Sequence, residues 1–315
     1  MELITLEAQS ERATLVPQAG CQCLGYQVGS LEVIAGPAGP DEWRAHPFSS
    51  GIPILFPWPG RVADGRFTFA GREHRLPVNE PRGHAMHGLT YNREFHVTRR
   101  GPFFVRAEFD TRSDADFARL WPWAFVLAID YEIGNGLRIK TSVRNTDDAV
   151  MPFGFGAHPY FHLPPSARGN RGAVTLELCA DSRWPLDSRL IPSGRPQALS
   201  GRFDLRRARP LGADTYDDAF QMQKSTAPVN AGGSAPPRAR LVDPALGMAL
   251  EVSADPAFGQ FVVYAPPDRG VIALEPYTCA PDAFNLAVRG VAAGMLTLKP
   301  GESFEAGFEI RLSAP

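Results

Sequence analysis

A histidine in an unusual setting is the first candidate for chemistry in this chain. It is His158, within GFGAHPYFHLP at residues 154–164, where glycines, aromatic residues and prolines surround it. Histidine has an ordinary pKa close to neutrality, so it could donate or accept a proton at physiological pH. Because Pro159 and Pro164 argue against a helix, His158 and His162 are expected on the same side of an extended segment. Taken alone, this segment favours a structural core histidine over a catalytic one.

A carboxylate in a setting typical of a general base follows later in the chain. Glu275 ends the apolar run of VIALEPYTCAPDAFN, residues 271–285. A carboxylate at the mouth of an apolar strand can be partly desolvated, and desolvation raises its pKa and makes it a better base near neutrality. The alternative is a solvated glutamate at the end of a strand.

Three more polar residues lie beside special backbone. Arg61 follows the proline-rich run GIPILFPWPG, and its fork of donors suits ligand oxygens, although a surface arginine is the alternative. His87 lies in GHAMHG, where a metal site with His84 is conceivable but lacks a third ligand nearby. A sugar hydroxyl or a structural hydrogen bond is the favoured partner of His87. Asp217 lies in YDDAF, a pair of carboxylates between aromatic residues.

Together these residues form an inventory for one kind of ligand. They offer one base, one acid and three hydrogen-bonding groups. A polyhydroxylated ligand needs such polar partners for its hydroxyls, and its C–H faces stack on aromatic rings. The neighbouring aromatic residues are Phe56, Trp58, Tyr160, Phe161 and Tyr277.

The elements that must position these side chains are strands. Residues 125–133 and 137–143 alternate apolar and polar side chains around the turn Gly134–Gly136, which predicts an antiparallel hairpin with one buried face. Residues 304–312 alternate in the same way, and a short helix is expected after the cap residue Ser113. Many strands and few helices predict an all-β fold, a large antiparallel β-sandwich of two sheets. Further strands are expected at 66–69, 73–76, 103–109, 174–178, 248–253 and 261–264.

Composition limits the class of protein. The chain has 315 residues, of which 44% are hydrophobic and 21% charged, and its formal net charge is −2. No basic stripe points to nucleic acid, and no run approaches the ~18 apolar residues of a membrane span. The N-terminus lacks the pattern of a signal peptide, so we expect a cytoplasmic protein whose four cysteines are reduced. No shift in composition marks a boundary within 1–315, so one domain is expected, with 225–237 as a flexible surface loop.

The chain resembles the aldose 1-epimerase (mutarotase) family. The matching segments follow in order along nearly the whole chain: GIPILFPWPGRVADGRFTFAGREHRLPVNEPRGHAMHGL, FGFGAHPYFHLP, LIPSG, YDDAF, LEPYTCAPDAFN and LKPGESF. The resemblance implies a large antiparallel β-sandwich with a sugar in a shallow cleft and no cofactor or metal. It implies His158 as general acid and Glu275 as general base. Arg61, His87 and Asp217 then occupy substrate-binding positions.

Three details of the resemblance concern individual residues. Asp217 is preferred over Asp218 because the family motif reads Asp, two variable residues, then Phe. Many members have Asn where this chain has Gly60, which removes an amide from the cleft and leaves the preferred sugar open. His162 stands where many members have a smaller polar residue, and its role stays open.

The function implied is interconversion of the α- and β-anomers of a hexose such as galactose or glucose, by acid–base opening and closure of the ring. The partner is then a monosaccharide, and the protein is a monomer or a homodimer. One alternative is an epimerase of phosphorylated hexoses, for which Arg82 and Arg93 could bind the phosphate. Others are a non-catalytic sugar sensor and a glycoside hydrolase that uses Asp217 and Glu275, which would leave His158 without a role.

Overall fold

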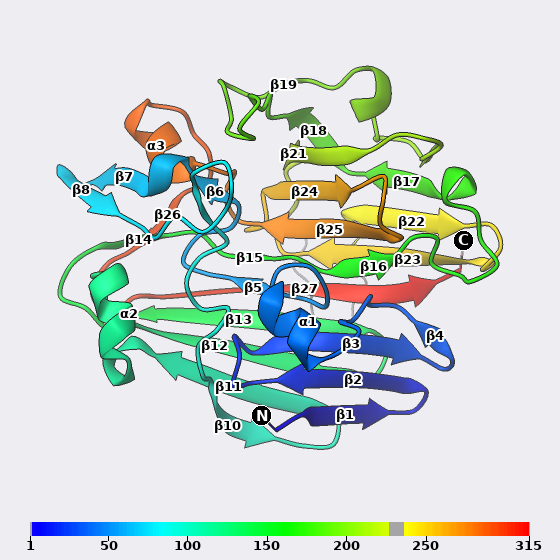
Figure 1. The fold of residues 1–315 in the computed structure, drawn as a ribbon, viewed down its shortest axis with the longest axis horizontal. Coiled ribbons are helices and arrows are strands. Elements are labelled where there is room, and N and C mark those ends of the chain that lie inside the picture. Colours follow the sequence, from blue (N-terminus) through cyan, green and yellow to red (C-terminus); the bar gives the residue numbers. More distant parts are fainter. Residues whose placement is uncertain (1, 227–235, 315) are drawn as a thin grey trace.

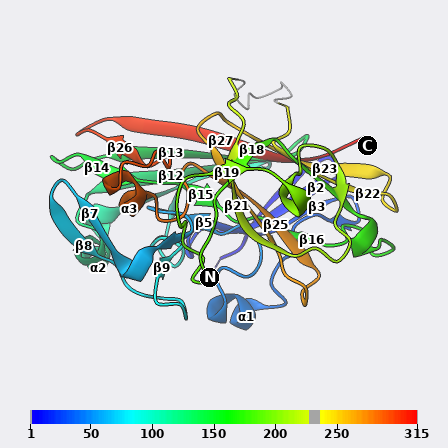
Figure 2. The same cartoon turned by 90° about the horizontal axis from the view of Figure 1, so that it is seen from above.

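Strands are the main regular structure of the described residues. The computed structural model describes residues 2–226 and 236–314. Two broad layers of strands face each other (Figures 1 and 2), which confirms the predicted antiparallel sandwich. Most of the segment predicted as a flexible loop, residues 227–235 of 225–237, lies outside the described residues.

The rear layer in Figure 1 is a nine-stranded sheet. Its strands in spatial order are β10 (His96–Arg100), β11 (Phe104–Asp110), β12 (Phe125–Glu132), β13 (Leu137–Asn145), β27 (Ser303–Ser313), β23 (Met248–Ala254), β22 (Ala239–Asp243), β17 (Thr175–Leu178) and β20 (Arg209–Pro210). The predicted hairpin is β12 with β13, and the predicted C-terminal strand is β27, which pairs with β13. The large apolar side chains of β12 that recur at every second residue are buried, as the period of two requires.

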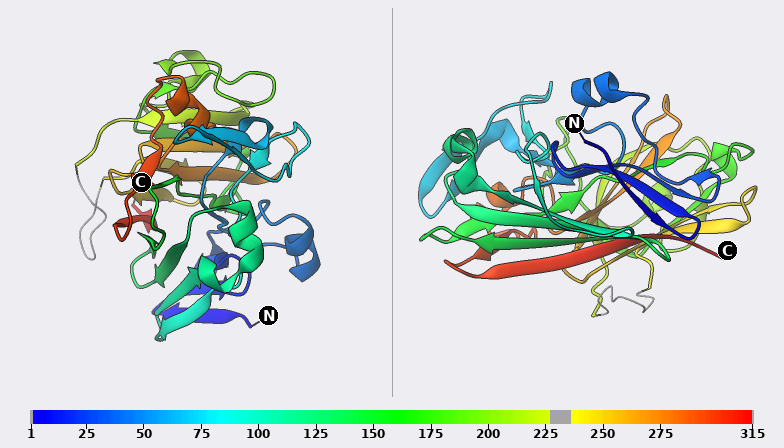
Figure 3. Two further views of the ribbon diagram at one scale, coloured as in Figure 1. Left: turned by 90° about the vertical axis from the view of Figure 1, so that its left-hand side faces the viewer. Right: turned by 90° about the horizontal axis from the view of Figure 1, so that it is seen from below.

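The front layer holds an eight-stranded sheet and, beside it, a four-stranded one. The eight strands are β19 (Gln197–Ala198), β18 (Ala180–Arg183), β21 (Tyr216–Met222), β24 (Gln260–Ala265), β25 (Val271–Tyr277), β15 (Gly156–Ala157), β5 (Ile54–Leu55) and β16 (Tyr160–His162), which pairs with β25. The four are β1 (Ile4–Ala8), β2 (Glu11–Val16), β3 (Gln22–Val28) and β4 (Leu31–Glu32). Seen from below, these N-terminal strands lie across the rear sheet (Figure 3, right).

The remaining elements are short. Three two-stranded pairs are β6 (Arg61–Val62) with β9 (Ala85–Met86), β7 (Arg66–Phe69) with β8 (Arg72–Arg75), and β14 (Met151–Phe153) with β26 (Leu296–Leu298). The α-helices of the described residues are α1 (Pro40–Ala45), α2 (Ala115–Leu120) and α3 (Ala283–Val288). The 3₁₀ turns are η1 (Ala63–Gly65), η2 (Thr111–Ser113), η3 (Arg171–Ala173) and η4 (Gly201–Phe203).

The predicted helix start is off by one residue. The cap of α2 is Asp114, whose carboxylate accepts a hydrogen bond from the backbone N–H of Phe117, whereas Ser113 lies in the preceding 3₁₀ turn. Both residue types cap helices, so the local sequence alone did not separate them. None of the helices in residues 2–226 and 236–314 is long and apolar enough to cross a membrane. The four cysteines, all within those ranges, are free thiols.

Aromatic side chains join the two layers. The ring of Phe56, just after β5 in the front sheet, lies 4.8 Å from that of Phe125 on β12 and 5.9 Å from that of Phe153 on β14. Edge-to-face contacts at such distances add to the free energy gained by burying the rings. This core packs against β5, and β15 and β25, which carry His158 at one end and Glu275, lie beside β5 in the same sheet.

Candidate active site

One cleft collects all five predicted site residues. It has a volume of about 820 Å³, and Arg61, His87, His158, Asp217 and Glu275 all line it. These residues are far apart in the sequence, and they come from β6, the loop after β9, the link between β15 and β16, β21 and β25. The segment around α1 forms another part of the wall, through Trp43, His46 and Phe48 among others.

Sheet register explains why His158 meets Glu275. On one side of His158, Gly156 of β15 pairs with Tyr277, and on the other side Tyr160 of β16 pairs with Ala273. The antiparallel register therefore places His158 directly opposite Glu275. Side chains alternate along β25, so Glu275 and Tyr277 project from the same face of the strand.

The two side chains are in contact and enclosed. His158 Nε2 lies 3.3 Å from Glu275 Oε1, and both residues are buried, with exposed fractions of 5% and 1%. The Tyr277 hydroxyl donates a 2.5 Å hydrogen bond to the other carboxylate oxygen, Oε2. The ring of Tyr160 stacks on that of His158 with centroids 4.4 Å apart, and its hydroxyl donates to the carbonyl of Phe48 at 2.6 Å.

Burial shifts the protonation of both groups. It raises the pKa of Glu275 well above its ordinary value, while the hydrogen bond from Tyr277 and the charge of Arg61 act in the opposite direction. Burial lowers the pKa of His158 to about 3, and the charges of Arg269 and Arg61 add to the effect. Because the two groups touch, they titrate as a pair that holds one exchangeable proton over a wide pH range.

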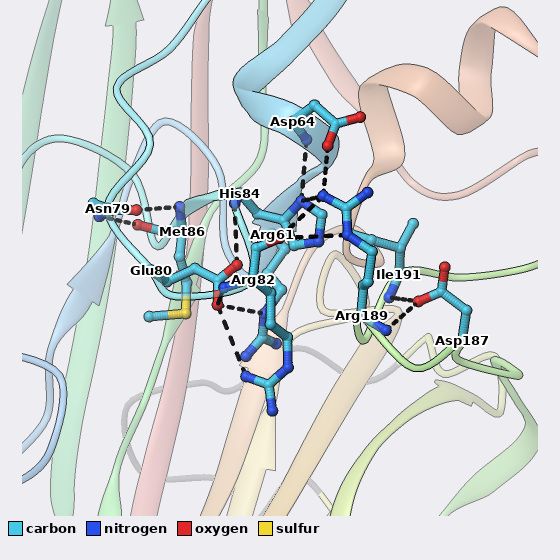
Figure 4. A network of polar contacts seen from close by, with 10 residues as sticks. All are labelled: Arg61, Asp64, Asn79, Glu80, Arg82, His84, Met86, Asp187, Arg189 and Ile191. Atoms are coloured by element: carbon cyan, nitrogen blue, oxygen red, sulfur yellow. Dashed lines mark hydrogen bonds and ion pairs between the residues drawn. The ribbon is translucent and has the colours of Figure 1, made fainter.

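Arg61 lies at the start of β6 and is anchored from two sides. Its Nε lies 4.0 Å from the carboxylate of Glu80, whose side chain is buried and accepts hydrogen bonds from the backbone N–H groups of Arg82 and His84. Figure 4 shows Glu80 beside the guanidinium groups of Arg61 and Arg82. On the other side, the carbonyl of Arg61 accepts a 2.6 Å hydrogen bond from the backbone N–H of Asp282, in the loop that follows β25.

His87 lines the same cleft, beside the Arg61 segment. Its ring lies edge-on to that of His158, with centroids 5.4 Å apart, and burial lowers its pKa well below the ordinary value. Its backbone N–H donates to the carbonyl of Gly60 at 2.8 Å, which ties the His87 segment to the Arg61 segment. The next residue, Gly88, has a φ of 75°, and a Cβ there would lie 2.2 Å from the carbonyl oxygen of Phe56.

The metal alternative finds no support in the geometry. His84 uses its Nδ1 to accept a hydrogen bond from the backbone N–H of Asp64. Within residues 2–226 and 236–314, no three His, Cys, Asp or Glu side chains gather as a set that could hold a metal ion.

The paired carboxylates of β21 have different surroundings. Asp218 forms ion pairs with Arg202 at 3.3 Å and with Arg183 at 3.9 Å. Burial raises the pKa of Asp217, and the charges of Arg61 and Arg82 oppose that rise. Both carboxylates line the cleft, and the choice of Asp217 as the sugar-binding one stays a prediction.

Four other residues noted in the sequence have separate outcomes. Arg82 lines the cleft, but Arg93 pairs with Asp114 at 3.1 Å outside the cleft, so the prediction that Arg93 could bind a phosphate there is wrong. His162 does not line the cleft, and its Nε2 lies 3.6 Å from the carboxylate of Glu32. Gly60 has a φ of 65°, and a Cβ there would lie 3.1 to 3.3 Å from Pro281.

The structure also adds residues that the sequence reasoning did not single out for a role. The sequence marks Tyr277 and Tyr160 only as aromatic surfaces, yet their hydroxyls contact Glu275 and His158, respectively. The spacing of two residues between Glu275 and Tyr277 on a strand is a signal that could have found the first contact. Glu80 and Asp282 act through loop backbone and long-range contacts, which no local pattern marks.

Comparisons with known proteins agree with this architecture. A sequence model of the family described as aldose 1-epimerase matches residues 2–311. The protein YihR of Escherichia coli K12, which is uncharacterised, is 24% identical over 98% of this chain and 92% of its own length. Galactose mutarotase of Mus musculus is 28% identical over 50% of this chain and 45% of its own length.

A solved structure extends the likeness to the fold. The crystal structure of a galactose mutarotase-like protein from Clostridium acetobutylicum superposes with a TM-score of 0.89 at 22% identity, covering 99% of this chain and 95% of that one. The family match spans nearly every residue, including all five that line the cleft. This chain therefore belongs to the aldose 1-epimerase family.

Proposed function

We propose that this protein interconverts the α- and β-anomers of an unphosphorylated aldohexose by opening and closing its ring. The observation that supports this most is the contact of an acid–base pair, His158 and Glu275, inside a cleft that also holds Arg61, His87 and Asp217. Galactose is the first sugar to test, because relatives matched over about half of the chain are named galactose mutarotases.

The reaction needs two proton transfers and no covalent intermediate. Ionised Glu275 takes the proton of the C1 hydroxyl while protonated His158 gives a proton to the ring oxygen, and the C1–O5 bond breaks. The free aldehyde turns about the C1–C2 bond and recloses with the opposite configuration, with both proton transfers reversed. Each positioned transfer contributes on the order of 10²–10⁴ in rate.

The other cleft residues hold the sugar in place. Arg61 and His87 lie close to the acid–base pair, so in this proposal they orient the ring oxygen and neighbouring hydroxyls. Asp217, whose desolvated carboxylate is a strong acceptor, anchors more distant hydroxyls. Fixing the sugar in one orientation converts proton transfer into a step within a single complex.

One observation favours a second candidate. Arg82 lines the cleft, so a phosphorylated hexose would find a cation there in addition to Arg61. Its guanidinium is already 3.8 Å from Glu80, which reduces the positive charge available to a phosphate. We therefore rank the phosphorylated sugar second.

Polarimetry tests the proposal. Freshly dissolved α-galactose, α-glucose and glucose 6-phosphate are followed with the wild type, Glu275→Gln and His158→Asn. The proposal expects the wild type to speed the drift of galactose or glucose, and both variants to lose most of that acceleration. Acceleration of the phosphorylated sugar alone would support the second candidate, and binding without acceleration would support a sensor.

A further inference from the structure

The proposed function, on which this inference rests, requires one particular distribution of protons between Glu275 and His158. In the reaction, Glu275 must begin ionised and His158 protonated. Burial works against that state, because a low-dielectric environment favours an uncharged carboxylic acid beside an uncharged imidazole. Some group near the pair has to favour the charged arrangement if the enzyme is to turn over efficiently.

The hydroxyl of Tyr277 is one such group. It donates to Glu275 Oε2 at 2.5 Å, so the carboxylate keeps its other oxygen, Oε1, toward His158 Nε2. Burial raises the pKa of Tyr277 well above its ordinary value, so the phenol stays protonated and remains a donor. A donor to a carboxylate oxygen stabilises the ionised form of that carboxyl more than the neutral form.

The hydroxyl of Tyr160 constrains the histidine. Its hydrogen is used in the 2.6 Å bond to the carbonyl of Phe48, so toward His158 the phenol oxygen can only accept. That oxygen lies 3.3 Å from Nε2, and Glu275 Oε1 lies 3.3 Å from the same nitrogen. Two acceptors therefore face Nε2, so the ring is held with a hydrogen on that nitrogen, as the neutral Nε2–H tautomer or as the imidazolium.

We propose that Tyr277 and Tyr160 are positioning residues that bias the pair toward an ionised Glu275 facing an N–H on His158 Nε2. Tyr277 favours the carboxylate by donating to it, and Tyr160 favours the protonated nitrogen by accepting from it. The two phenols act on opposite members of the pair, and both favour the arrangement that can exchange protons with the sugar. Gly156 makes room for the first of them, because a Cβ there would lie 2.6 Å from the ring of Tyr277.

Other charged groups also face the pair. Arg61 and Asp217 act on Glu275 in opposite directions, and Arg61 and Arg269 lower the pKa of His158. The rings of His87 and Tyr264 lie 5.4 and 6.3 Å from that of His158. These groups are unchanged in the variants below, so the difference between each variant and the wild type reports on one hydroxyl.

Tyr277→Phe and Tyr160→Phe test the proposal, with Tyr131→Phe as the matched control. Tyr131 is also buried and donates to a backbone carbonyl, that of Cys21, at 2.6 Å, but it does not line the cleft. For Tyr277→Phe we expect kcat for galactose to fall roughly 10- to 100-fold, with KM nearly unchanged. The alkaline limb of its pH profile should move up by about one pH unit, because ionising Glu275 becomes harder. Tyr160→Phe should lose roughly threefold in kcat, and the control should change neither quantity.

A measurement on the resting protein keeps this proposal separate from the proposed function. Carbon-13 NMR of the Glu275 carboxyl and nitrogen-15 NMR of the His158 ring report the position of the proton without any sugar. We expect a hydrogen on Nε2 in the wild type, and a larger share of the exchangeable proton on Glu275 in both Phe variants than in the wild type. An unprotonated Nε2 in the wild type, or variants whose spectra and alkaline limb match the wild type, would overturn the proposal. If the wild type accelerates no sugar, the proposed function fails and the spectra still decide this inference.

Discussion

Replacing Glu275 by Gln should remove activity and at the same time make the protein more stable at alkaline pH. Glu275 is buried, and burial raises its pKa well above the ordinary value of 4.5. In the unfolded chain the carboxyl ionises near that ordinary value, whereas in the folded protein it ionises at higher pH. The unfolded state therefore gains stability from ionisation first, and the free energy of unfolding declines as pH rises between the two values.

The slope of that decline can be calculated. One group that is protonated in the folded state and ionised in the unfolded state changes the free energy of unfolding by about 1.4 kcal/mol per pH unit. His158 has the opposite sign, because its lowered pKa removes stability as pH falls below its ordinary value of 6.5. Above about pH 7 the imidazole is already neutral in the unfolded chain, so the slope there reports the one proton that the folded pair holds. The buried thiols also titrate at high pH, but they are the same in both proteins.

The assay is urea unfolding of wild type and Glu275→Gln at several pH values between about 7 and 9. The advantage of the variant should grow with pH by up to about 1.4 kcal/mol per unit, until the folded carboxyl itself ionises. Acceleration of galactose anomerisation should fall on the order of 10²–10⁴ in the same variant. Glu309→Gln is the control for activity, because Glu309 is a buried glutamate of β27 that does not line the cleft. Burial raises its pKa as well, so its stability curve should also depend on pH while its activity stays unchanged. Parallel stability curves for wild type and Glu275→Gln would refute the reasoning.

Three further predictions concern the pH profile and the support of the cleft. Plotted against pH, the rate should show a broad plateau. Its acid limb should lie near the His158 pKa of about 3, and its alkaline limb well above 4.5, the ordinary pKa of Glu275. A profile centred on an ordinary histidine pKa would contradict the shared proton. Asp282→Ala removes side-chain hydrogen bonds to the Ala63 N–H and to Asn285, so the free energy of unfolding should fall by about 2 kcal/mol in urea titrations. KM should rise several-fold because Ala63 lies two residues after Arg61, and an unchanged KM would argue that the Asp282 carboxylate does not help to position that segment. Gly88→Ala forces a Cβ against the carbonyl of Phe56, so the free energy of unfolding should fall by about 3 kcal/mol or more, as measured by circular dichroism melting. A melt like that of the wild type would show that the loop around Gly88 can move to relieve the contact.

Much of the fold could be predicted from the alternation of side chains. The β12–β13 hairpin and β27 followed from the period of two, because one face of each strand is buried. The pairing of β27 with β13 joins the two ends of a long chain segment, and a pattern within one strand carries no information about its partner. For the same reason the order of the nine-stranded sheet could be found only in the structure.

The candidate site, too, could be predicted only in part from the sequence. The five residues of the cleft were found because each lies in a recognisable segment, and the structure brings all five together. The contact of His158 with Glu275 depends on the register of β15 and β16 against β25. The placement of Arg61 depends on a buried glutamate, Glu80, and on a backbone hydrogen bond from Asp282. Such supports act across loops, where spacing in the sequence does not report distance in space.

Exchange NMR at equilibrium tests the central claim most directly. The H1 signals of α- and β-galactose are separate, so the rate at which magnetisation passes between them is the rate of anomerisation itself. We predict rapid exchange with catalytic amounts of the wild type, and exchange close to that of buffer with His158→Asn or Glu275→Gln. If the wild type leaves the exchange of galactose, glucose and their 6-phosphates at the rate in buffer, the account of this cleft as a site of anomerisation is wrong.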